Sequence, residues 1–314
     1  MVIENEVSIV IVSMNRMDNL NICLPSIEKY TKCKHKIYVV AYMFSKENLA
    51  ELREKYPQVI IVESNEIRGF SENNNLALRQ VTSEFVFIQN DDTEYKEPVL
   101  DKLLEAYKQT PKATIMSPKL LLGNGTVQFN GRRKFNYWTF MLGVLSIRKL
   151  PKSKYENKEG IFLSYNISGA AFLIKTEDFR RIGFFDEKYF FSPEDTAVST
   201  KINRNGGYCY TDANTSIVHY HGVSSRKTKL FYATTCSAYL GMYLFYCDTT
   251  MKQSFYKILL LIKIIVMSLV NVLLPSQHKQ DYIYVYKKLF YAIRCNQTPK
   301  QLFLEEYNLV RNIK

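Results

Sequence analysis

The sequence lacks paired cysteines and internal repeats. Its six cysteines form no Cys-X-X-Cys pair, whereas a disulfide framework or a structural zinc site usually shows regular spacing. We therefore expect reduced thiols and a reducing compartment. No repeat or low-complexity tract is present, which excludes solenoid, fibrous and disordered classes. The opening MVIENEVSIVIVS carries two acids, no basic residue and no cleavage-like site, so it predicts a strand and a cytoplasmic protein rather than a secretion signal.

Acidic residues are scarce in the last part of the chain. The formal net charge is +12, and residues 226–314 hold 13 Lys and Arg against 4 Asp and Glu, a net +9 that leaves +3 for residues 1–225. A basic surface suits nucleic acid, anionic lipid or an acidic substrate. A nucleic-acid-binding protein should carry basic and stacking aromatic residues on its main domain. Because the excess lies in the tail, we expect no nucleic-acid partner.

Short apolar runs alternate with segments of helical periodicity over the first 90 residues. We expect strands at 7–13, 36–42, 58–64 and 84–90, and helices at 18–30, 46–56 and 71–81. Strands that alternate with helices form parallel βαβ units with right-handed crossovers. The sequence therefore predicts an α/β fold, a doubly wound and mostly parallel sheet with helices on both faces. At 314 residues the chain can form one large domain or two of moderate size.

Polar residues follow three of the expected strands, at 13–16, 65–69 and 90–92. In doubly wound sheets, ligands bind beyond the C-terminal ends of the strands. The segment FVFIQNDDTEY is the most informative, because a buried strand runs directly into Asp91 and Asp92. The two acids are consistent with a turn or a helix cap. They are equally consistent with a Mg²⁺ or Mn²⁺ site, since these ions take one or two carboxylates plus substrate phosphates.

Two further polar clusters follow later in the chain. In FFSPEDTA, Glu194 and Asp195 begin an expected helix from Pro193 to about Asn205, and capping is again an alternative because acids are favoured in a first helical turn. In VHYHG, His219 and His221 point the same way if the segment is extended, which favours a shared cleft over two structural histidines.

The order of these clusters resembles the family 2 glycosyltransferases of the GT-A fold, in particular the rhamnosyltransferase-like members that build bacterial surface polysaccharides. The resemblance spans roughly residues 7–225. It rests on VSIVIVSMNR, NEIRGFSENNNLAL, FIQNDDTEY at the place of the DxD motif, ISGAAFLIKTEDFRRIGFFDEKYFFSPED and VHYHG. A lone DxD motif would be weak evidence, whereas the ordered set is specific.

The resemblance implies a role for each cluster. It places Asp92 as the metal ligand, His219 near the metal or diphosphate, and His221 as a second choice. Asp195 is the implied general base, and Glu194 orients Asp195 or the acceptor. The implied nucleotide-sugar site consists of Ser13, Asn15, Arg16, Asn65, Gly69, Asn75 and Asp91. The cofactors are then Mn²⁺ or Mg²⁺ and a UDP- or dTDP-sugar, and a glycan or glycolipid is the acceptor.

The sequence departs from the family pattern at several positions. Asn90 replaces the usual first acid of the metal motif, and Ala41 stands where most relatives place an Asp that helps to hold the nucleobase. Ala197 and Lys201 replace an acid and an arginine that commonly follow the Glu-Asp pair. The resemblance therefore leaves the nucleobase and the acceptor open.

The basic tail contains the apolar run KILLLIKIIVMSLVNVLL at 257–274. A membrane span needs about 20 largely uncharged residues, and Lys263 interrupts this run. On a helical wheel, an arc of about 140° holds four polar side chains: Lys257, Lys263, Ser268 and Asn271. Leu260 and Ile264 share that arc. We interpret the segment as an amphipathic helix in the plane of an anionic membrane; a helical bundle packed on the catalytic domain is the alternative.

The sequence thus predicts a catalytic domain at 1–225, with nucleotide-sugar binding at about 1–95 and the acceptor side at about 96–225. A basic helical region follows at 226–314. We expect an inverting, metal-dependent glycosyltransferase on the cytoplasmic face of the membrane, with its oligomeric state open. The alternatives are a non-catalytic carbohydrate-binding protein and a sugar nucleotidyltransferase. The latter should carry a Gly-rich loop after its first strand, and SMNRMDN contains no glycine.

Overall fold

The computed structural model of this chain describes residues 6–128, 134, 136–145, 158–220 and 230–311. Within these ranges the strands are β1 Val7–Met14, β2 His35–Tyr42, β3 Ile60–Ser64, β4 Phe85–Asn90, β5 Thr93–Glu94, β6 Ala113–Leu121, β7 Val127–Gln128, β8 Ile161–Ser164, β9 Ala171–Lys175 and β10 Tyr208–His219. The helices are α1 Met17–Tyr30, α2 Lys46–Lys55, α3 Phe70–Leu78, α4 Val99–Gln109, α5 Tyr137–Val144, α6 Thr176–Arg181, α7 Glu194–Arg204, α8 Phe231–Tyr246, α9 Thr250–Leu273, α10 Gln277–Arg294 and α11 Pro299–Arg311.

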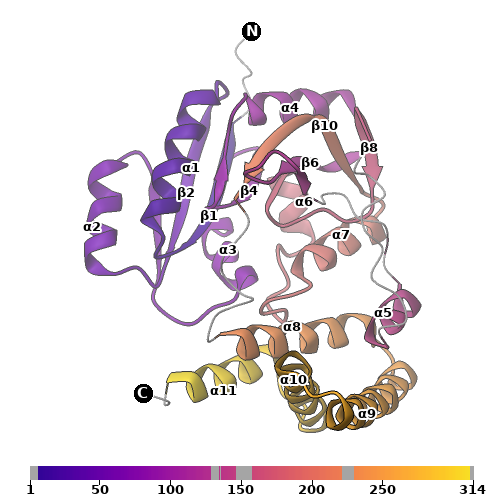
Figure 1. Cartoon of the computed structure of the whole chain (residues 1–314). Helices are drawn as coiled ribbons and strands as arrows, with labels where there is room; N and C mark the ends of the chain where they lie inside the picture. The colour runs from indigo at the N-terminus through magenta and orange to yellow at the C-terminus, as the bar shows by residue number, and fades with distance from the viewer. Residues whose placement is uncertain (1–5, 129–133, 135, 146–157, 221–229, 312–314) are drawn as a thin grey trace. The chain divides into compact units, whose positions relative to one another are not determined.

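The described strands form one sheet in the order β3-β2-β1-β4-β9-β6-β10-β5, with β7 beside β6 and β8 beside β10 (Figure 1). The strands β3, β2, β1 and β4 are parallel, as the alternating pattern predicts. The strand β9 is antiparallel to both β4 and β6, and β10 returns parallel to β6. The mostly parallel, doubly wound sheet is therefore confirmed.

Helices cover both faces of this sheet. Alternate residues of β1 point to opposite faces, so Ile9 and Ile11 join one buried cluster and Val10 joins the other. The first cluster includes residues from α1, α2 and α4, and the second includes residues from α3, α6 and α7. Because both faces are buried, β1 and β4 consist of continuous apolar runs, which is typical of parallel strands.

The described residues divide into two compact units. The sheet unit holds all the strands with α1 to α4, α6 and α7. The helical unit holds α5, α8 to α11 and residues 187–193. Thus α5 and residues 187–193, which the sequence analysis assigned to the segment before residue 226, cluster with the tail helices. All six cysteines are free, as expected from their spacing.

The helical unit has an apolar core of its own, and α9 contributes Tyr256, Leu260 and Ile264 to it. The ammonium group of Lys263 donates a hydrogen bond to the carbonyl oxygen of Val144 and lies 4.4 Å from the centre of the Tyr286 ring. The arc that the sequence analysis took as the polar face of α9 is therefore the packed face. The choice of polar face was wrong because a lysine can bury its aliphatic stem when its amine finds an acceptor and an aromatic ring.

Burial also sets a pH dependence in this unit. Desolvation lowers the pKa of Lys263 to about 8, whereas an unfolded lysine titrates near about 10.4. Between these pH values the unfolded chain holds a proton that the folded chain has released, so this group's contribution to stability rises with pH. We expect Lys263→Met to remove that rise, so that the variant's stability advantage shrinks as pH increases from about 7 to about 10.

The single tryptophan, Trp138, lies in the helical unit and can report urea unfolding at each pH. Lys257→Met, on the same helix, is the matched control. A difference between the Lys263→Met variant and the parent that stays constant across this pH range would contradict the expectation.

Candidate active site

Two carboxylates lie where β4 ends. The residues of β4 from Phe85 to Gln89 are buried, and its pairing with β1 places Asn90 opposite Val12. The loops that follow both strands therefore meet at one edge of the sheet. There Asp91 accepts a hydrogen bond from the Ser13 hydroxyl at 2.6 Å and another from the Asn19 amide at 3.1 Å. The rigid sheet thus fixes the position of this carboxylate.

Asp91 is a weaker acid than an exposed aspartate. Burial raises the pKa of Asp91 to about 6, and the neighbouring charge of Asp92 acts in the same direction. The hydrogen bond from Ser13 opposes these effects because it stabilises the ionised form. Two adjacent, partly buried acids are an unfavourable arrangement by themselves, and a cation or a positively charged ligand would relieve it.

The second acid, Asp92, lies close to His219 at the end of β10. The antiparallel register of β10 with β5 places His219 opposite Thr93, one residue beyond Asp92. The Oδ1 atom of Asp92 and the Nε2 atom of the buried His219 are 3.1 Å apart. On the other side of the ring, Nδ1 lies 2.7 Å from the side-chain oxygen of Gln128, and the Asn90 amide lies 3.2 Å from Nε2. With Nδ1 donating to Gln128, Nε2 carries the lone pair of the ring and accepts from the side-chain amide of Asn90, a contact that a bound cation would replace.

This donor set fits a divalent cation. Adjacent ligands at about 2.1 Å on an octahedral Mg²⁺ or Mn²⁺ lie about 3.0 Å apart, close to the separation of Oδ1 and Nε2. The described residues contain no group of three or more His, Cys, Asp or Glu side chains suited to a metal. The described residues therefore offer two ligands here, and a substrate diphosphate and water would supply the others. His221 lies outside the described residues.

The Glu-Asp pair begins α7 in the same unit. Asp195 Oδ1 accepts from the Thr196 amide at 2.6 Å, which is a local contact at the start of a helix. The position also relates to β4. Gly169 lies close to Asp195: a Cβ atom at Gly169 would be 3.8 Å from the Cβ atom of Asp195. The backbone carbonyl of the next residue, Ala170, accepts a hydrogen bond from the backbone N–H of Asn90 at 3.1 Å. One short segment thus lies between the first turn of α7 and the end of β4.

Comparison with known proteins identifies the family. The sequence model described as "Glycosyl transferase family 2" matches residues 8–183, more than half of the chain. This chain belongs to glycosyl transferase family 2. The enzyme interpretation is therefore confirmed, and the match covers the Ser13 loop, the Asp91–Asp92 pair and α6. Glu194, Asp195 and His219 lie beyond it.

Two curated relatives are similar to this glycosyltransferase. The O-antigen biosynthesis protein RfbC of Myxococcus xanthus is 23% identical over 232 residues, which are 70% of this chain and 18% of that protein. The N-acetylglucosaminyl-diphospho-decaprenol L-rhamnosyltransferase of Mycobacterium tuberculosis is 19% identical over 197 residues, 55% of this chain and 62% of that one. The chain therefore spans less than two thirds of either relative.

Solved structures confirm the fold. GalNAc-T7, crystallised with UDP, GalNAc and Mn²⁺, superposes with a TM-score of 0.56 at 17% identity over 70% of this chain and 44% of its own. The mannosyltransferase PcManGT of Pyrobaculum calidifontis, in complex with GDP-Man and Mn²⁺, gives 0.53 at 14% identity over 93% and 86%. At these identities the likeness establishes the GT-A type fold.

Two further residues expected in the nucleotide site, Asn15 and Asn75, form hydrogen bonds with neighbouring elements of the fold. Asn15 has a left-handed backbone (φ 54°), and its side-chain oxygen accepts from the Ser45 amide at 2.9 Å, which ties the loop after β1 to the start of α2. Asn75 is buried, and its amide exchanges hydrogen bonds with the backbone of Phe185. We interpret Asn15 and Asn75 as residues that brace the fold around the site.

The remaining expected residues lie on loops of the sheet edge. Arg16 is half-exposed on the loop after β1 and forms an ion pair with Asp18 at 2.6 Å. Asn65 is exposed just after β3. Gly69 precedes α3, and its amide donates to Glu72 at 2.9 Å. All three follow the ends of parallel strands, and Arg16 carries the only positive charge among them.

Sequence reasoning missed two residues that hold the acids and their histidine. Asn19 reaches Asp91 from the first turn of α1, in a segment whose periodicity drew attention to its apolar face. Gln128 reaches His219 from the two-residue strand β7. Nothing local marks either residue as a partner of the acids or of His219.

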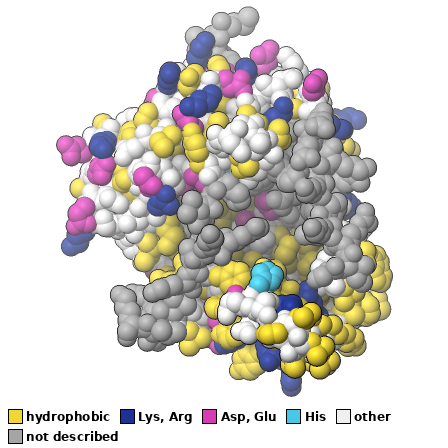
Figure 2. All heavy atoms as spheres, viewed as in Figure 1, with side chains coloured by type: hydrophobic (Ala, Val, Ile, Leu, Met, Phe, Trp, Pro, Cys, Tyr) yellow, Lys and Arg dark blue, Asp and Glu magenta, His cyan; other side chains and the backbone are white. Residues whose placement is uncertain are grey.

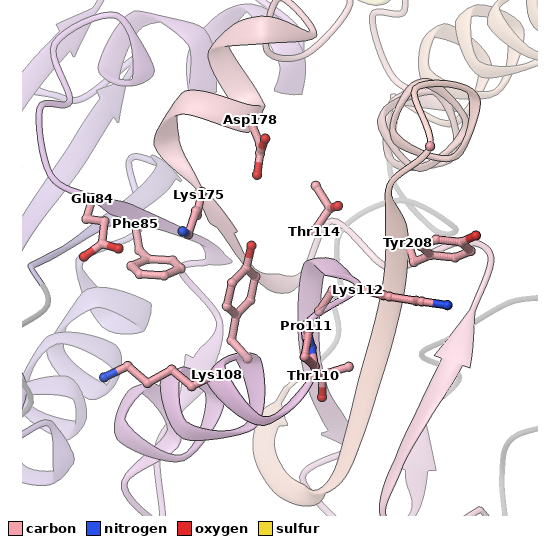
Figure 3. Close-up of a pocket in the computed structure, with 13 residues that line it drawn as sticks. Glu84, Phe85, Lys108, Thr110, Pro111, Lys112, Thr114, Lys175, Asp178 and Tyr208 are labelled. Atoms are coloured by element: carbon pink, nitrogen blue, oxygen red, sulfur yellow. The ribbon is translucent and has the colours of Figure 1, made fainter.

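A separate pocket lies at the other edge of the sheet. It has a volume of about 680 Å³ and is lined by the starts of β4, β6 and β10 and the end of the antiparallel β9 (Figure 3). Figure 3 shows Lys108, Lys112 and Lys175 around it together with Glu84 and Asp178. Because the acids of the candidate site follow the opposite end of β4, this pocket is distinct from the candidate active site.

Proposed function

We propose that this glycosyltransferase moves a sugar from a nucleoside diphosphate sugar to a glycan or lipid-linked acceptor, with inversion at the anomeric carbon and with a divalent cation. The observation that carries the proposal is the 3.1 Å approach of Asp92 Oδ1 to His219 Nε2 at the end of β4. Two lone-pair donors at that separation suit Mn²⁺ or Mg²⁺. A cation held there supplies Lewis-acid stabilisation of the departing diphosphate.

The donor side of the proposed site is the edge of β1 and β4. Ser13 and Asn19 hold Asp91, and Arg16 on the same loop can exchange Asp18 for a phosphate oxygen, which a guanidinium binds in bidentate fashion. The GT-A neighbours named above were crystallised with Mn²⁺ and UDP or GDP-mannose. Ala41, near the end of β2, offers no carboxylate to hold a nucleobase. The proposed donor is a uridine or a thymidine diphosphate sugar.

The acceptor side is the first turn of α7. In the proposed reaction, Asp195 accepts the proton of the acceptor hydroxyl as the acceptor oxygen forms its bond to the anomeric carbon. The bond from that carbon to the diphosphate oxygen breaks on the opposite face, and its electron pair leaves with the nucleoside diphosphate. Glu194 orients Asp195 or the acceptor. A positioned base typically contributes about 10² to 10⁴ in rate.

The relatives suggest the class of acceptor. One is named for O-antigen biosynthesis and the other for a diphospho-decaprenol substrate. We infer a lipid-linked or surface-polysaccharide acceptor, and an enzyme that works peripherally at the cytoplasmic face of the membrane. The net +9 charge of residues 226–314 supports contact with an anionic surface.

The proposal can be tested with the purified full chain. We expect thermal stabilisation by UDP or dTDP that requires Mn²⁺ or Mg²⁺, and transfer of a sugar from the matching donor to a diphospho-lipid analogue. Nuclear magnetic resonance of the product should show an anomeric configuration opposite to that of the donor. Nucleotide binding that is indifferent to both metals, or a product with retained configuration, would contradict the proposal.

A further inference from the structure

The outward face of α9 is apolar along almost its whole length. Exposed hydrophobic side chains recur from its first turn to its last, among them Phe255, Ile258, Leu261, Ile265, Leu269 and Leu273. After the first residue of α9, Ser254 is the one polar side chain among its exposed residues. Figure 2 shows hydrophobic side chains gathered at the lower right, where Figure 1 places α9 and α5. Soluble proteins rarely expose so continuous an apolar surface without a partner.

The opposite face of α9 is packed, which determines the side of the helix that is exposed. Tyr256, Leu260 and Ile264 are buried in the core of the helical unit, which also contains residues of α10. At about 100° per residue, this packed arc and the exposed apolar arc are centred on opposite sides of the helix. Lys263 lies beside the packed arc and is held by the Val144 carbonyl. Rotating α9 to hide its apolar face would break that contact.

Helix α5 extends the same surface. Trp138 is 65% exposed, and its ring centre lies 6.4 Å from that of Phe255 in an edge-on arrangement. Tyr137 further joins the two helices through a 3.4 Å hydrogen bond to the Lys252 carbonyl. An exposed tryptophan beside an apolar helix face is typical of the boundary between water and the lipid interior, because its ring is apolar and its N–H group is polar.

We propose that this surface, the exposed face of α9 together with Trp138, lies in the interface of an anionic lipid bilayer, with α9 parallel to the membrane plane. The inference deepens the proposed function and rests on it for the side of the membrane. Charge complementarity favours anionic lipid as the occupant: residues 226–314 carry +9, and a Lys or Arg near an anionic surface strengthens binding to it.

An in-plane arrangement fits better than a span. The 24 residues of α9 are long and apolar enough to cross a bilayer by length and composition, and 17% of its most apolar window is buried. However, α10 shares the core along which α9 packs and carries exposed Lys287 and Arg294. A spanning α9 would draw these charges into hydrocarbon. Lying flat, the helix immerses its bare face by about 5 to 10 Å and leaves α10 in water.

Trp138 is the single tryptophan of the chain and therefore reports on this surface directly. We expect its emission to shift to shorter wavelength when the full chain is mixed with vesicles of equal parts phosphatidylcholine and phosphatidylglycerol. Brominated acyl chains should quench it. Vesicles of phosphatidylcholine alone should bind more weakly, and salt should weaken binding to the anionic vesicles because exposed charges are screened within about 10 Å at 0.1 M.

A paired substitution separates the apolar contribution from the charge. Ile258 and Leu269 are 57% and 62% exposed, so Ile258→Gln with Leu269→Gln should leave folding intact. We expect it to lower vesicle affinity on the order of 10- to 100-fold through the lost apolar transfer. The matched control, Ile22→Gln with Leu309→Gln, changes residues of α1 and α11 that are 48% and 46% exposed and belong to neither α5 nor α9, and it should bind as the parent does.

Several results would overturn the proposal. One is unchanged Trp138 emission while the protein sediments with anionic vesicles, and another is equal loss of vesicle affinity in both paired variants. If the parent is a dimer whose Trp138 is already shielded from acrylamide, and the α9 variant is a monomer, the surface is a subunit interface. Transfer to a soluble acceptor analogue is measured separately, so failure of the proposed function would appear as inactive parent enzyme whatever the vesicle result.

Discussion

Asp92→Ala is expected to abolish the metal-dependent part of nucleotide binding while the protein remains folded. Asp92 Oδ1 and His219 Nε2 are the two protein atoms that face each other at 3.1 Å. Removal of the carboxylate leaves the ring as a lone ligand without a compensating charge. Loss of a group that only hydrogen-bonds to a metal ligand typically costs about 10- to 100-fold in metal affinity, so loss of the ligand itself should cost at least as much. Calorimetric titration with nucleoside diphosphate, with and without Mn²⁺, measures the difference.

A matched control is available at the other edge of the sheet. Asp178 lines the separate pocket there and bonds to Arg181 at 2.6 Å. Asp178→Ala should leave nucleotide and Mn²⁺ binding unchanged. If Asp92→Ala binds nucleotide with the same dependence on Mn²⁺ as the parent, the ion is held elsewhere and the assignment of Asp92 fails.

The position of this site followed from the sequence because two strong patterns agree there. A continuous apolar run predicts a strand buried on both faces, and a parallel sheet binds ligands at the C-terminal ends of its strands. The two patterns therefore predict that the adjacent Asp91 and Asp92 lie at the C-terminal end of β4. The partners that hold them were not predictable, since Asn19 and Gln128 lie 72 and 91 residues in sequence from Asp91 and His219. The packing of α1 brings Asn19 to Asp91, and the pairing of β6 with both β7 and β10 brings Gln128 to His219.

What the sequence left open and the one face that it assigned wrongly have similar physical origins. The residues AFLIK of β9 are equally suitable for a parallel or an antiparallel strand, and its antiparallel pairing is decided by the chain path around it. On the helical wheel of α9, the polar arc also contained Leu260 and Ile264. The sequence alone therefore did not decide whether this arc is exposed with Lys263 or buried with the two apolar residues. The acceptor at Val144 and the ring of Tyr286 decide in favour of burying that arc. Both partners are distant in sequence.

Asp195→Asn is expected to reduce turnover by about 10² to 10⁴, the usual range for loss of a general base. The substitution is informative because the competing explanation of Asp195 is structural. Its Oδ1 accepts from the Thr196 amide at 2.6 Å and lies 3.3 Å from the Thr196 hydroxyl. An asparagine oxygen can accept both bonds, and asparagine is as good as aspartate at the start of a helix. Melting temperature should therefore change little.

The side-chain amide that Asp195→Asn introduces cannot take a proton at neutral pH, so the loss should appear in turnover while nucleotide and Mn²⁺ affinity stay close to those of the parent. That pattern distinguishes this change from Asp92→Ala, which weakens donor binding. Glu194→Gln is the matched control one residue away at the start of α7. If Asp195→Asn transfers sugar normally and Glu194→Gln does not, Glu194 is the base. If both variants transfer normally, the pair acts only as a helix cap, and proton removal from the acceptor must be assigned to another residue.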